Sequence, residues 1–237
     1  MRHRLIAVSI LSAGLIISAV VFGSYFYQSR LIQPKNIKVV GAAMQKFTSD
    51  IIKWRITINR NVNLSEVSKG YGLVKNDLQT LEALMTTAGI QSGEITIQPV
   101  NANPVYNQSG IQTGYSISQS LTIISKDLEK VESVALNPAS LVEKGIVLQS
   151  SNLEYYYSKI DEIKRKLLAQ ATSDARQRAE EIIKNTGDKV DRIISARAGV
   201  FQITEPYSTE SMDYGVYNTA TKEKDITVTV HVLYNLK

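Results

Sequence analysis

The chain has no cysteine and only two histidines among its 237 residues. Without cysteine there is no disulfide, no thiolate nucleophile and no cysteine-based metal site. His3 lies near the N-terminus and His231 near the C-terminus. Because the only two histidines lie at opposite ends of the chain, we expect no zinc site of two or three histidines. His231 lies in an alternating run and faces away from its apolar residues, which indicates a half-exposed strand residue. We therefore expect no catalytic, cofactor-binding or metal-binding residues.

Acidic residues are missing from the first part of the chain. No Asp or Glu precedes Asp50, whereas Arg2, Arg4, Arg30 and Lys35 all lie there. Removing these four from the 27 Lys and Arg leaves 23, against 22 Asp and Glu, so the net charge of +5 overstates how basic the rest is. Non-specific nucleic-acid binding needs clustered, uncompensated Lys and Arg, so we exclude nucleic acid as a partner.

Short motifs for enzymatic chemistry are also missing. Gly70 and Gly72 fall inside a predicted helix with no strand before them, which argues against a nucleotide loop. The pairs Asp161-Glu162 and Glu180-Glu181 are sequence neighbours on a helix and diverge by about 100°. They therefore predict a solvated helix face, and the protein is not expected to be an enzyme.

What the chain does contain is a long uncharged run from Leu5 to Tyr27. As a helix rising about 1.5 Å per residue, its roughly 23 residues would measure about 34 Å, against a hydrocarbon core of about 30 Å. Arg2 and Arg4 before the run favour a cytoplasmic amino end. The sequence thus predicts a single-pass anchor in a bacterial inner (plasma) membrane, with the C-terminal region in the periplasm or outside.

A cleaved signal peptide is the alternative to this anchor. Val21 and Gly23 form a weak cleavage site, which would leave a periplasmic protein without a membrane segment. Against cleavage, the apolar run is longer than a usual signal core, and Tyr25 to Tyr27 followed by Arg30 is typical of an interfacial aromatic belt.

Alternating strands and amphipathic helices follow the anchor. Strands are predicted at 36–41, 51–60, 94–100 and 115–124, with a helix from a capping box of Asn63 and Glu66 to Gly89, and turn or loop at 101–104 and 106–113. Later, Asp127 is predicted to cap a second helix. A third helix is predicted to run from a Ser158–Asp161 capping box to about Asn185. Strands are predicted at 146–157 and 226–236, extended chain at 190–203 and a loop at 205–221. On the second of these helices the predicted apolar stripe is Ile160, Ile163, Leu167, Ala171, Ala175, Ala179 and Ile182.

The fold class predicted is α+β, with helix-covered, mainly antiparallel sheets in two subdomains after an N-terminal transmembrane helix. Residues 1–35 would be the cytoplasmic tip, anchor and linker. Residues 36–125 would form the first subdomain in the order β-β-α-β-β, and residues 126–237 the second. Strands could pair across that boundary.

Several loose motifs in order carry a family resemblance. They are Lys38-Val-Val-Gly41, the strand of Trp54, Ala88-Gly-Ile90, Glu94-Ile-Thr-Ile97, Thr113-Gly-Tyr115, Leu121-Thr-Ile-Ile124, Asp127-Leu-Glu-Lys-Val131, the run from Ala171 to Glu180, and Val228 to Tyr234. Residues 36–237 thereby resemble the SIMPL-domain family of bacterial envelope proteins, of the periplasmic immunogenic protein type, and its membrane-anchored branch. The resemblance implies an α+β fold, hollow-ring homo-oligomers and a link to oxidative-stress tolerance, and it implies no catalytic residues.

Tyrosines supply the candidate contact site. Tyr combines apolar area with a polar tip and is favoured at contact surfaces. The candidates for a subunit or ligand contact are Tyr155, Tyr156, Tyr157, Tyr207, Tyr214 and Tyr217. Core packing and an ordinary surface loop explain them equally well. The leading hypothesis is a self-assembling, non-enzymatic envelope protein, and the alternative is an extracytoplasmic module that binds a protein or polymer through the Tyr-rich loop.

Overall fold

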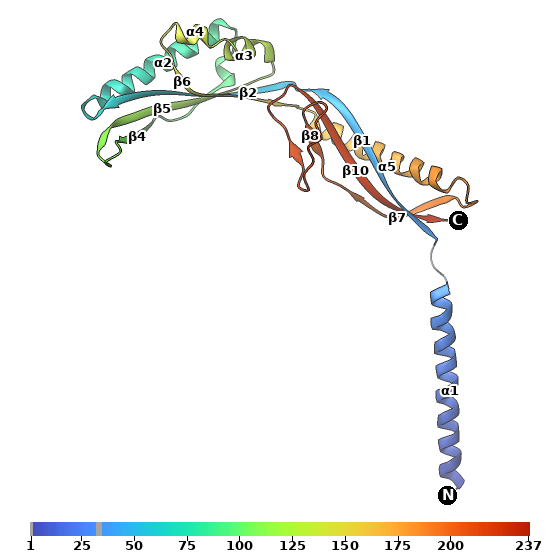
Figure 1. Ribbon diagram of the computed structural model, residues 1–237. Helices are drawn as coiled ribbons and strands as arrows, with labels where there is room; N and C mark the ends of the chain where they lie inside the picture. Colours follow the sequence, from blue (N-terminus) through green and yellow to red (C-terminus); the bar gives the residue numbers. More distant parts are fainter. Residues whose placement is uncertain (1, 32–34) are drawn as a thin grey trace. The chain divides into compact units, whose positions relative to one another are not determined.

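The computed structural model describes the backbone of residues 2–31 and 35–237, and the side chains of residues 12–27 and 35–237. Helix α1 (Arg2–Leu31) precedes the α+β region (Figure 1). Residues 5–11 of the predicted anchor lie outside the described side chains, and the anchor stays a prediction. No helix among the described residues has both the length and the apolar character required to cross a membrane.

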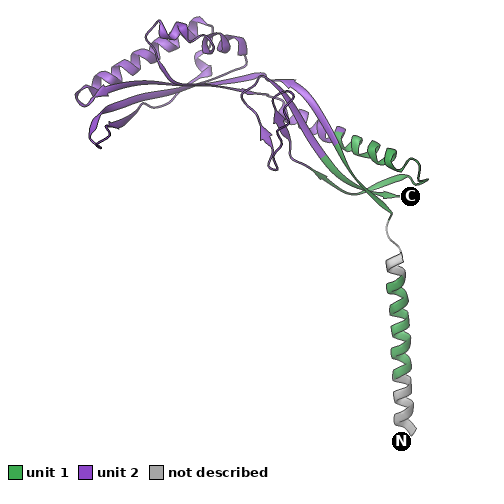
Figure 2. Ribbon diagram, in the orientation of Figure 1, with its two compact units in different colours: residues 1–41, 171–198, 230–237 green, residues 42–170, 199–229 purple. Residues whose placement is uncertain are grey.

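Two compact units make up the chain (Figure 2). Unit 1 contains residues 1–41, 171–198 and 230–237, and unit 2 contains residues 42–170 and 199–229. Each unit is therefore assembled from segments far apart in sequence. The predicted α+β class with mainly antiparallel sheets is confirmed. The predicted division between residues 125 and 126 stays a prediction.

The first sheet lies within unit 2 and is built around β2 (Ile51–Asn63). Its order is β3 (Ile95–Ile97), β5 (Gln112–Ser125), β2 and β6 (Leu148–Tyr156), and β4 (Asn101–Tyr106) pairs with β5. All these pairings are antiparallel. The alternation predicted for β2 is confirmed, because its four apolar side chains are fully buried: Ile52, Trp54, Ile56 and Ile58.

Helices cover one face of this sheet: α2 (Val67–Thr87), α3 (Leu128–Ala135) and the short α4 (Ala139–Val142). Val74, Leu81 and Met85 of α2 join the core cluster of β2 and β5. At the end of α2, Gly89 has φ +86°, and the Gly89 and Ile90 amides donate to the Thr86 and Met85 carbonyls. That pair of bonds is a Schellman motif, so the predicted stop at Gly89 is confirmed.

The second sheet has β10 (Glu223–Leu236) beside the edge strand β1 (Asn36–Thr48). On its other side β10 pairs antiparallel with β7 (Val190–Ala198) and β8 (Gln202–Thr204), and β8 pairs parallel with β9 (Val216–Tyr217). Helix α5 (Ile160–Ile183) lies along this sheet in Figure 1. β10 alternates as predicted, since Ile226, Val228, Val230, Val232 and Tyr234 are buried while His231 is exposed.

Within unit 1, α5 approaches β1 through small residues. Ala171, Ala175 and Ala179 are fully buried. A Cβ placed on Gly41 would collide with the Ala171 carbonyl oxygen and lie 2.5 Å from the Ala175 nitrogen. The predicted stripe is wrong at its last position: Ile182 is exposed and Ile183 is buried, because four-residue steps continue from Ala179.

The predictions for residues 94–113 are wrong in part, because pairing with a distant strand outweighs the local preferences of these residues. The predicted strand at 94–100 is only β3, after the short 3₁₀ helix η2 (Ser92–Glu94). The predicted turn at 101–104 is instead β4, an edge strand, where the missing N–H of Pro104 is tolerated. The polar loop predicted for 106–113 shortens to a turn, since β4 runs to Tyr106 and β5 begins at Gln112.

Both predicted capping boxes are also wrong. The 3₁₀ turn η1 (Leu64–Glu66) separates Asn63 from α2, and Asn63 makes no side-chain cap there. The Asn63 amide donates instead to the Glu66 carboxylate over 3.3 Å. The Ser158 hydroxyl and amide both donate to Asp50, over 2.5 and 2.7 Å, so Ser158 is held by a residue more than a hundred positions away.

Candidate functional site

Tyr155 is the buried member of the tyrosine set. It ends β6, and its hydroxyl donates to Glu132 Oε1 over 3.0 Å. Glu132 Oε2 also lies 3.4 Å from the Lys222 ammonium. Burial, reinforced by the bond to Glu132, raises the pKa of Tyr155 to about 12. The phenol therefore stays protonated as a donor to Glu132, which fits a structural network within unit 2.

Lys224 is buried beside this network, with 1% of its surface exposed. Its ammonium donates to the Thr221 carbonyl and lies 5.9 Å from the centre of the Tyr155 ring. Loss of hydration lowers the pKa of Lys224 to about 8, because a buried ammonium is costly to charge. Such an amine is nearer to neutrality than an exposed lysine.

Three more of the tyrosines make ring contacts within unit 2. The rings of Tyr156 and Tyr217 lie 6.1 Å apart, and those of Tyr157 and Phe47 lie 5.1 Å apart. The Tyr156 hydroxyl donates to Glu154 over 3.1 Å. The Tyr155 amide donates to the Thr219 carbonyl, which fastens the loop at 205–221 to the end of β6. These tyrosines therefore hold chain segments together.

Tyr207 and Tyr214 are the most exposed of the six tyrosines. Their side chains are 88% and 82% exposed, and Tyr207 has φ +63°. Lys46 lies 4.6 Å from the centre of the Tyr207 ring, a cation–π distance. Large aromatic rings displayed on a loop are the part of the predicted site that remains available to a partner.

The predicted site thus divides by role. The structure brings Tyr156 and Tyr217 together, buries Tyr155, and leaves Tyr207 and Tyr214 in solvent. Sequence reasoning missed Glu132, Lys222 and Lys224. A signal existed for Lys224, because it shares strand parity with Ile226 and Val228 and so falls on the buried face.

Next to Lys222, unit 2 has a charged hollow of about 500 Å³. It is lined by Ser49, Asp50, Lys126, Asp127, Leu128, Glu129 and Lys222. The Ser49 hydroxyl is buried and has no hydrogen-bond partner among the described residues. Asp127 accepts from the Lys130 amide, the N-cap predicted for α3, and also pairs with the Lys130 ammonium at 2.7 Å, so part of this charge is already compensated.

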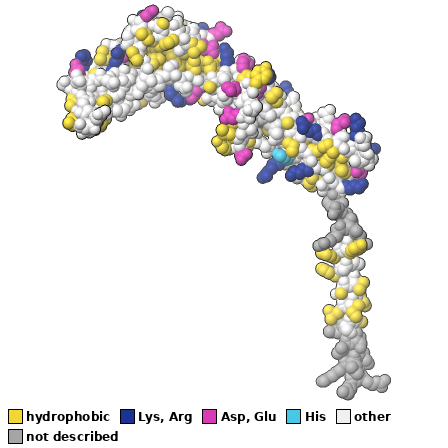
Figure 3. All heavy atoms as spheres, viewed as in Figure 1, with side chains coloured by type: hydrophobic (Ala, Val, Ile, Leu, Met, Phe, Trp, Pro, Cys, Tyr) yellow, Lys and Arg dark blue, Asp and Glu magenta, His cyan; other side chains and the backbone are white. Residues whose placement is uncertain are grey.

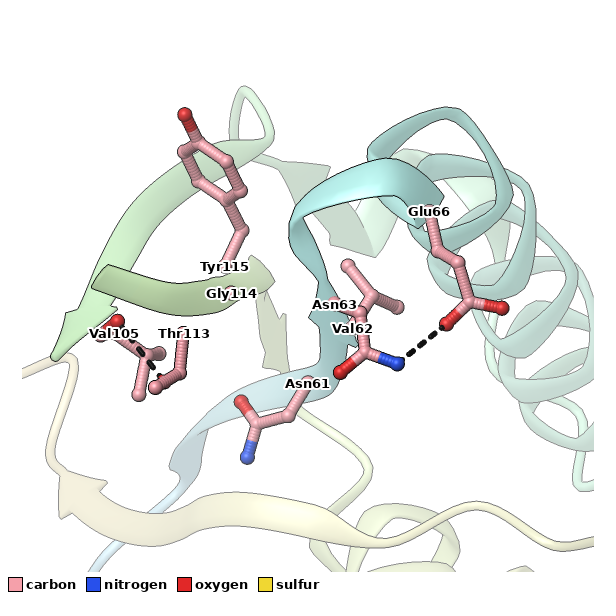
Figure 4. Close-up of a pocket in the computed structure, with 8 residues that line it drawn as sticks. All are labelled: Asn61, Val62, Asn63, Glu66, Val105, Thr113, Gly114 and Tyr115. Carbon is pink, nitrogen blue, oxygen red and sulfur yellow. Dashed lines mark hydrogen bonds between the residues drawn. The ribbon is translucent and has the colours of Figure 1, made fainter. Parts of the chain in front are cut away.

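A second hollow of unit 2, of about 250 Å³, lies where β2 and β4 end and β5 begins (Figure 4). Asn61 and Asn63 present amides there, and the Thr113 hydroxyl donates to the Val105 carbonyl over 3.2 Å. Glu66 is its one ionisable lining residue apart from the phenol of Tyr115. This arrangement can form hydrogen bonds but offers no nucleophile activated by a base.

Within the described part of the chain, no group of three or more His, Asp or Glu side chains is placed to hold a metal ion. A family model described as "SIMPL: Protein of unknown function (DUF541)" matches residues 37–234. The chain belongs to the SIMPL family. That description names no reaction, and a comparison with curated proteins finds no match. The family match spans strands of both sheets, from β1 to β10, so it concerns the whole α+β region.

Proposed function

We propose that this SIMPL protein is a non-enzymatic component of the bacterial envelope. It is anchored by Leu5–Tyr27 in the inner membrane and assembles into a ring-like homo-oligomer that contributes to stress tolerance. Support for assembly comes from the sheet edges and the exposed apolar side chains. Support for the anchor comes from the sequence, where no charged residue interrupts Leu5–Tyr27.

The free edge of β1 is the observation that carries this proposal. β1 is 13 residues long and, in the described sheet, borders β10 alone. Natural edge strands are usually short, or carry Pro, bulges or many charges that oppose pairing. β1 has no Pro, its two charged residues are Lys38 and Lys46, and it exposes Val40 and Met44 by 40% and 60%. A second copy of the chain can add to such an edge.

Membrane attachment would strengthen weak contacts of this kind. If each copy is tethered on the same side of one membrane, the copies share a plane and their effective concentration rises. Closed symmetry is the usual outcome of association between identical chains. A cyclic ring with its axis along the membrane normal satisfies both conditions.

The test of assembly is the mass of the full-length protein in detergent, by light scattering with negative-stain imaging. We expect a uniform oligomer for the wild type. Val40→Lys with Met44→Lys should lower the mass toward that of a monomer, because two charges would oppose pairing at the β1 edge. Leu64→Lys is the matched control, since Leu64 is 51% exposed and lies outside both sheets. A monomeric wild type contradicts the proposal.

The anchor has its own test, independent of assembly. Intact mass of the membrane-extracted protein should include Met1 or Arg2. A mature chain that begins near Ser24 and is free of membrane would replace the anchored form with the cleaved, periplasmic one.

A second function is favoured by the exposed rings of Tyr207 and Tyr214. Displayed aromatic rings suit the binding of a peptide or a glycan polymer. Under this alternative, the double variant Tyr207→Ala, Tyr214→Ala would keep its oligomeric mass and lose co-sedimentation with insoluble peptidoglycan. If neither variant nor wild type co-sediments, this alternative is wrong for that polymer.

A further inference from the structure

Unit 1 contains a small cationic hollow that the preceding proposal does not use. It measures about 300 Å³ and is lined by Lys38, Ser195, Arg197, His231, Val232 and Leu233. The residues come from three strands, β1, β7 and β10, of which β10 pairs with the other two. Figure 3 shows the cyan histidine among dark-blue Lys and Arg side chains. No carboxylate lines the hollow.

The cations here are not used in ion pairs. Across residues 35–237, neither Lys38, Arg197 nor His231 forms a salt bridge. The nearby strand ends behave differently, because Lys35 pairs with Asp188 at 2.8 Å and Lys237 pairs with Asp191 at 2.6 Å. Acidic partners thus compensate Lys35 and Lys237 at the strand ends but not the cations that line the hollow.

The strand register places two donors of this hollow side by side. His231 is directly opposite Arg197 in the antiparallel ladder of β10 and β7. Side chains directly opposite have Cβ atoms about 4.5–5.5 Å apart, so the imidazole and the guanidinium can reach the same ligand. Lys38 adds a third donor from β1. Lys38 and Arg197 are the two charged residues of the hollow, and an anion bound between them would be attracted to both.

We propose that this hollow binds a phosphate group. The Arg197 guanidinium offers two parallel N–H donors, which match two oxygens of a phosphate. The Lys38 ammonium, the His231 imidazole and the Ser195 hydroxyl supply further donors at the rim. The half-buried Leu233, directly opposite Ser195 in the ladder, adds an apolar side chain beside these donors. A small phosphate ester fits the volume better than a polymer.

Two sources offer the same chemistry: a free phosphate or the headgroup of an anionic lipid. Lys38 follows Tyr27 by about 11 residues, which span at most about 40 Å when extended. An anchored chain would therefore keep the hollow within reach of headgroups. The phosphate site itself does not depend on the anchor or on assembly.

The test uses full-length protein in detergent and isothermal titration with three probes. Inorganic phosphate represents the free anion, glycerophosphoglycerol represents an anionic headgroup, and zwitterionic glycerophosphocholine is the charge control. We expect binding of one of the first two at millimolar concentration or below, and weaker binding of the third. Tighter phosphate binding would identify a soluble ligand, and tighter glycerophosphoglycerol binding a lipid headgroup.

Variants decide whether the hollow is the site. Arg197→Gln should lower the affinity for the preferred probe by about tenfold or more, because it removes a charged bidentate donor. Lys38→Gln should also lower this affinity, and it replaces Arg197→Gln in the test if Arg197→Gln does not fold. Arg192→Gln is the matched control, an exposed arginine of β7 outside the hollow. Absence of binding, or equal loss in Arg192→Gln and Arg197→Gln, would overturn the proposal.

Discussion

The two units bury helices against their sheets with side chains of very different size. In unit 2, α2 contributes Leu81 and Met85 to a core that includes Trp54. In unit 1, α5 meets β1 through Gly41, Ala171 and Ala175. A core of large side chains is damaged mainly by removing atoms, whereas a close approach of backbones is damaged by adding them. Opposite substitutions should therefore be harmful in the two units.

The largest expected effect is that of Gly41→Ala. The added Cβ would meet the Ala171 carbonyl oxygen and the Ala175 nitrogen, backbone atoms that cannot rotate away. We expect a loss of about 4 kcal/mol in the free energy of unfolding, measured by urea denaturation. Gly72→Ala is the control, since nothing lies within 4 Å of its added Cβ. Equal effects of the two substitutions would show that α5 does not rest on β1.

The next effect belongs to the core of unit 2. Leu81→Ala should lower the free energy of unfolding by about 3 kcal/mol, because Leu81 is fully buried and its loss leaves a cavity. Leu64→Ala, at a half-exposed leucine, should change it little. A small effect of Leu81→Ala in the same denaturation experiment would mean that this core collapses readily around lost atoms, which would weaken the contrast between the units.

A polar contact in unit 2 should have an intermediate effect. Arg60 donates from Nε and Nη2 to the two Asp77 carboxylate oxygens, over 2.6 and 2.8 Å, and from Nη2 to the Gly145 carbonyl over 2.7 Å. It thereby ties β2 to α2 and to the turn after α4. Asp77→Asn should cost about 2 kcal/mol, since Arg60 loses a charged partner. Thermal denaturation measures the loss as a lower melting temperature. Glu66→Gln is the control, since Glu66 forms an exposed pair with Lys69, and it should leave the melting temperature unchanged.

The smallest expected change is a gain. Lys224→Met should stabilise the protein by about 1 kcal/mol at pH 7, because it replaces a buried ammonium with an apolar side chain of similar length. With the pKa of Lys224 lowered to about 8, the folded wild type loses this proton before the unfolded chain does. Wild-type stability from this group therefore rises between about pH 8 and 10.5.

The advantage of Lys224→Met should consequently shrink over that range. Denaturation of both proteins at pH 7 and pH 9.5 measures it. Lys222→Met is a comparison at a more exposed lysine of the same segment, paired with Glu132. An advantage that grows with pH would contradict the assigned direction of the Lys224 pKa.

Strand alternation allowed much of the fold to be predicted, but not its pairing partners. The buried faces of β2 and β10 follow from a period of two, which is visible within ten residues. β4 was missed because Asn101 and Pro104 are turn formers, and pairing with β5 outweighs that local preference. The capping role predicted for Ser158 failed for a related reason: Asp50, remote in sequence, offers it stronger hydrogen bonds.

The sequence identified the six tyrosines of the candidate site but not which of them would be buried, paired or exposed. Nothing local distinguishes buried Tyr155 from exposed Tyr214, since burial depends on Glu132 and the loop that reaches β6. Whether the exposed rings contact a partner stays a prediction.

The sequence alone determined which side chains face inward along β2 and β10, and it ruled out sites that require cysteine or several histidines. Those properties depend on local periodicity and on the residues available. Tertiary structure decided that Lys224 would be buried, that Gly41 would touch α5, and that Lys38, Arg197 and His231 would share one hollow. These residues come from segments far apart along the chain, and they become neighbours only when the strands pair and the helix packs.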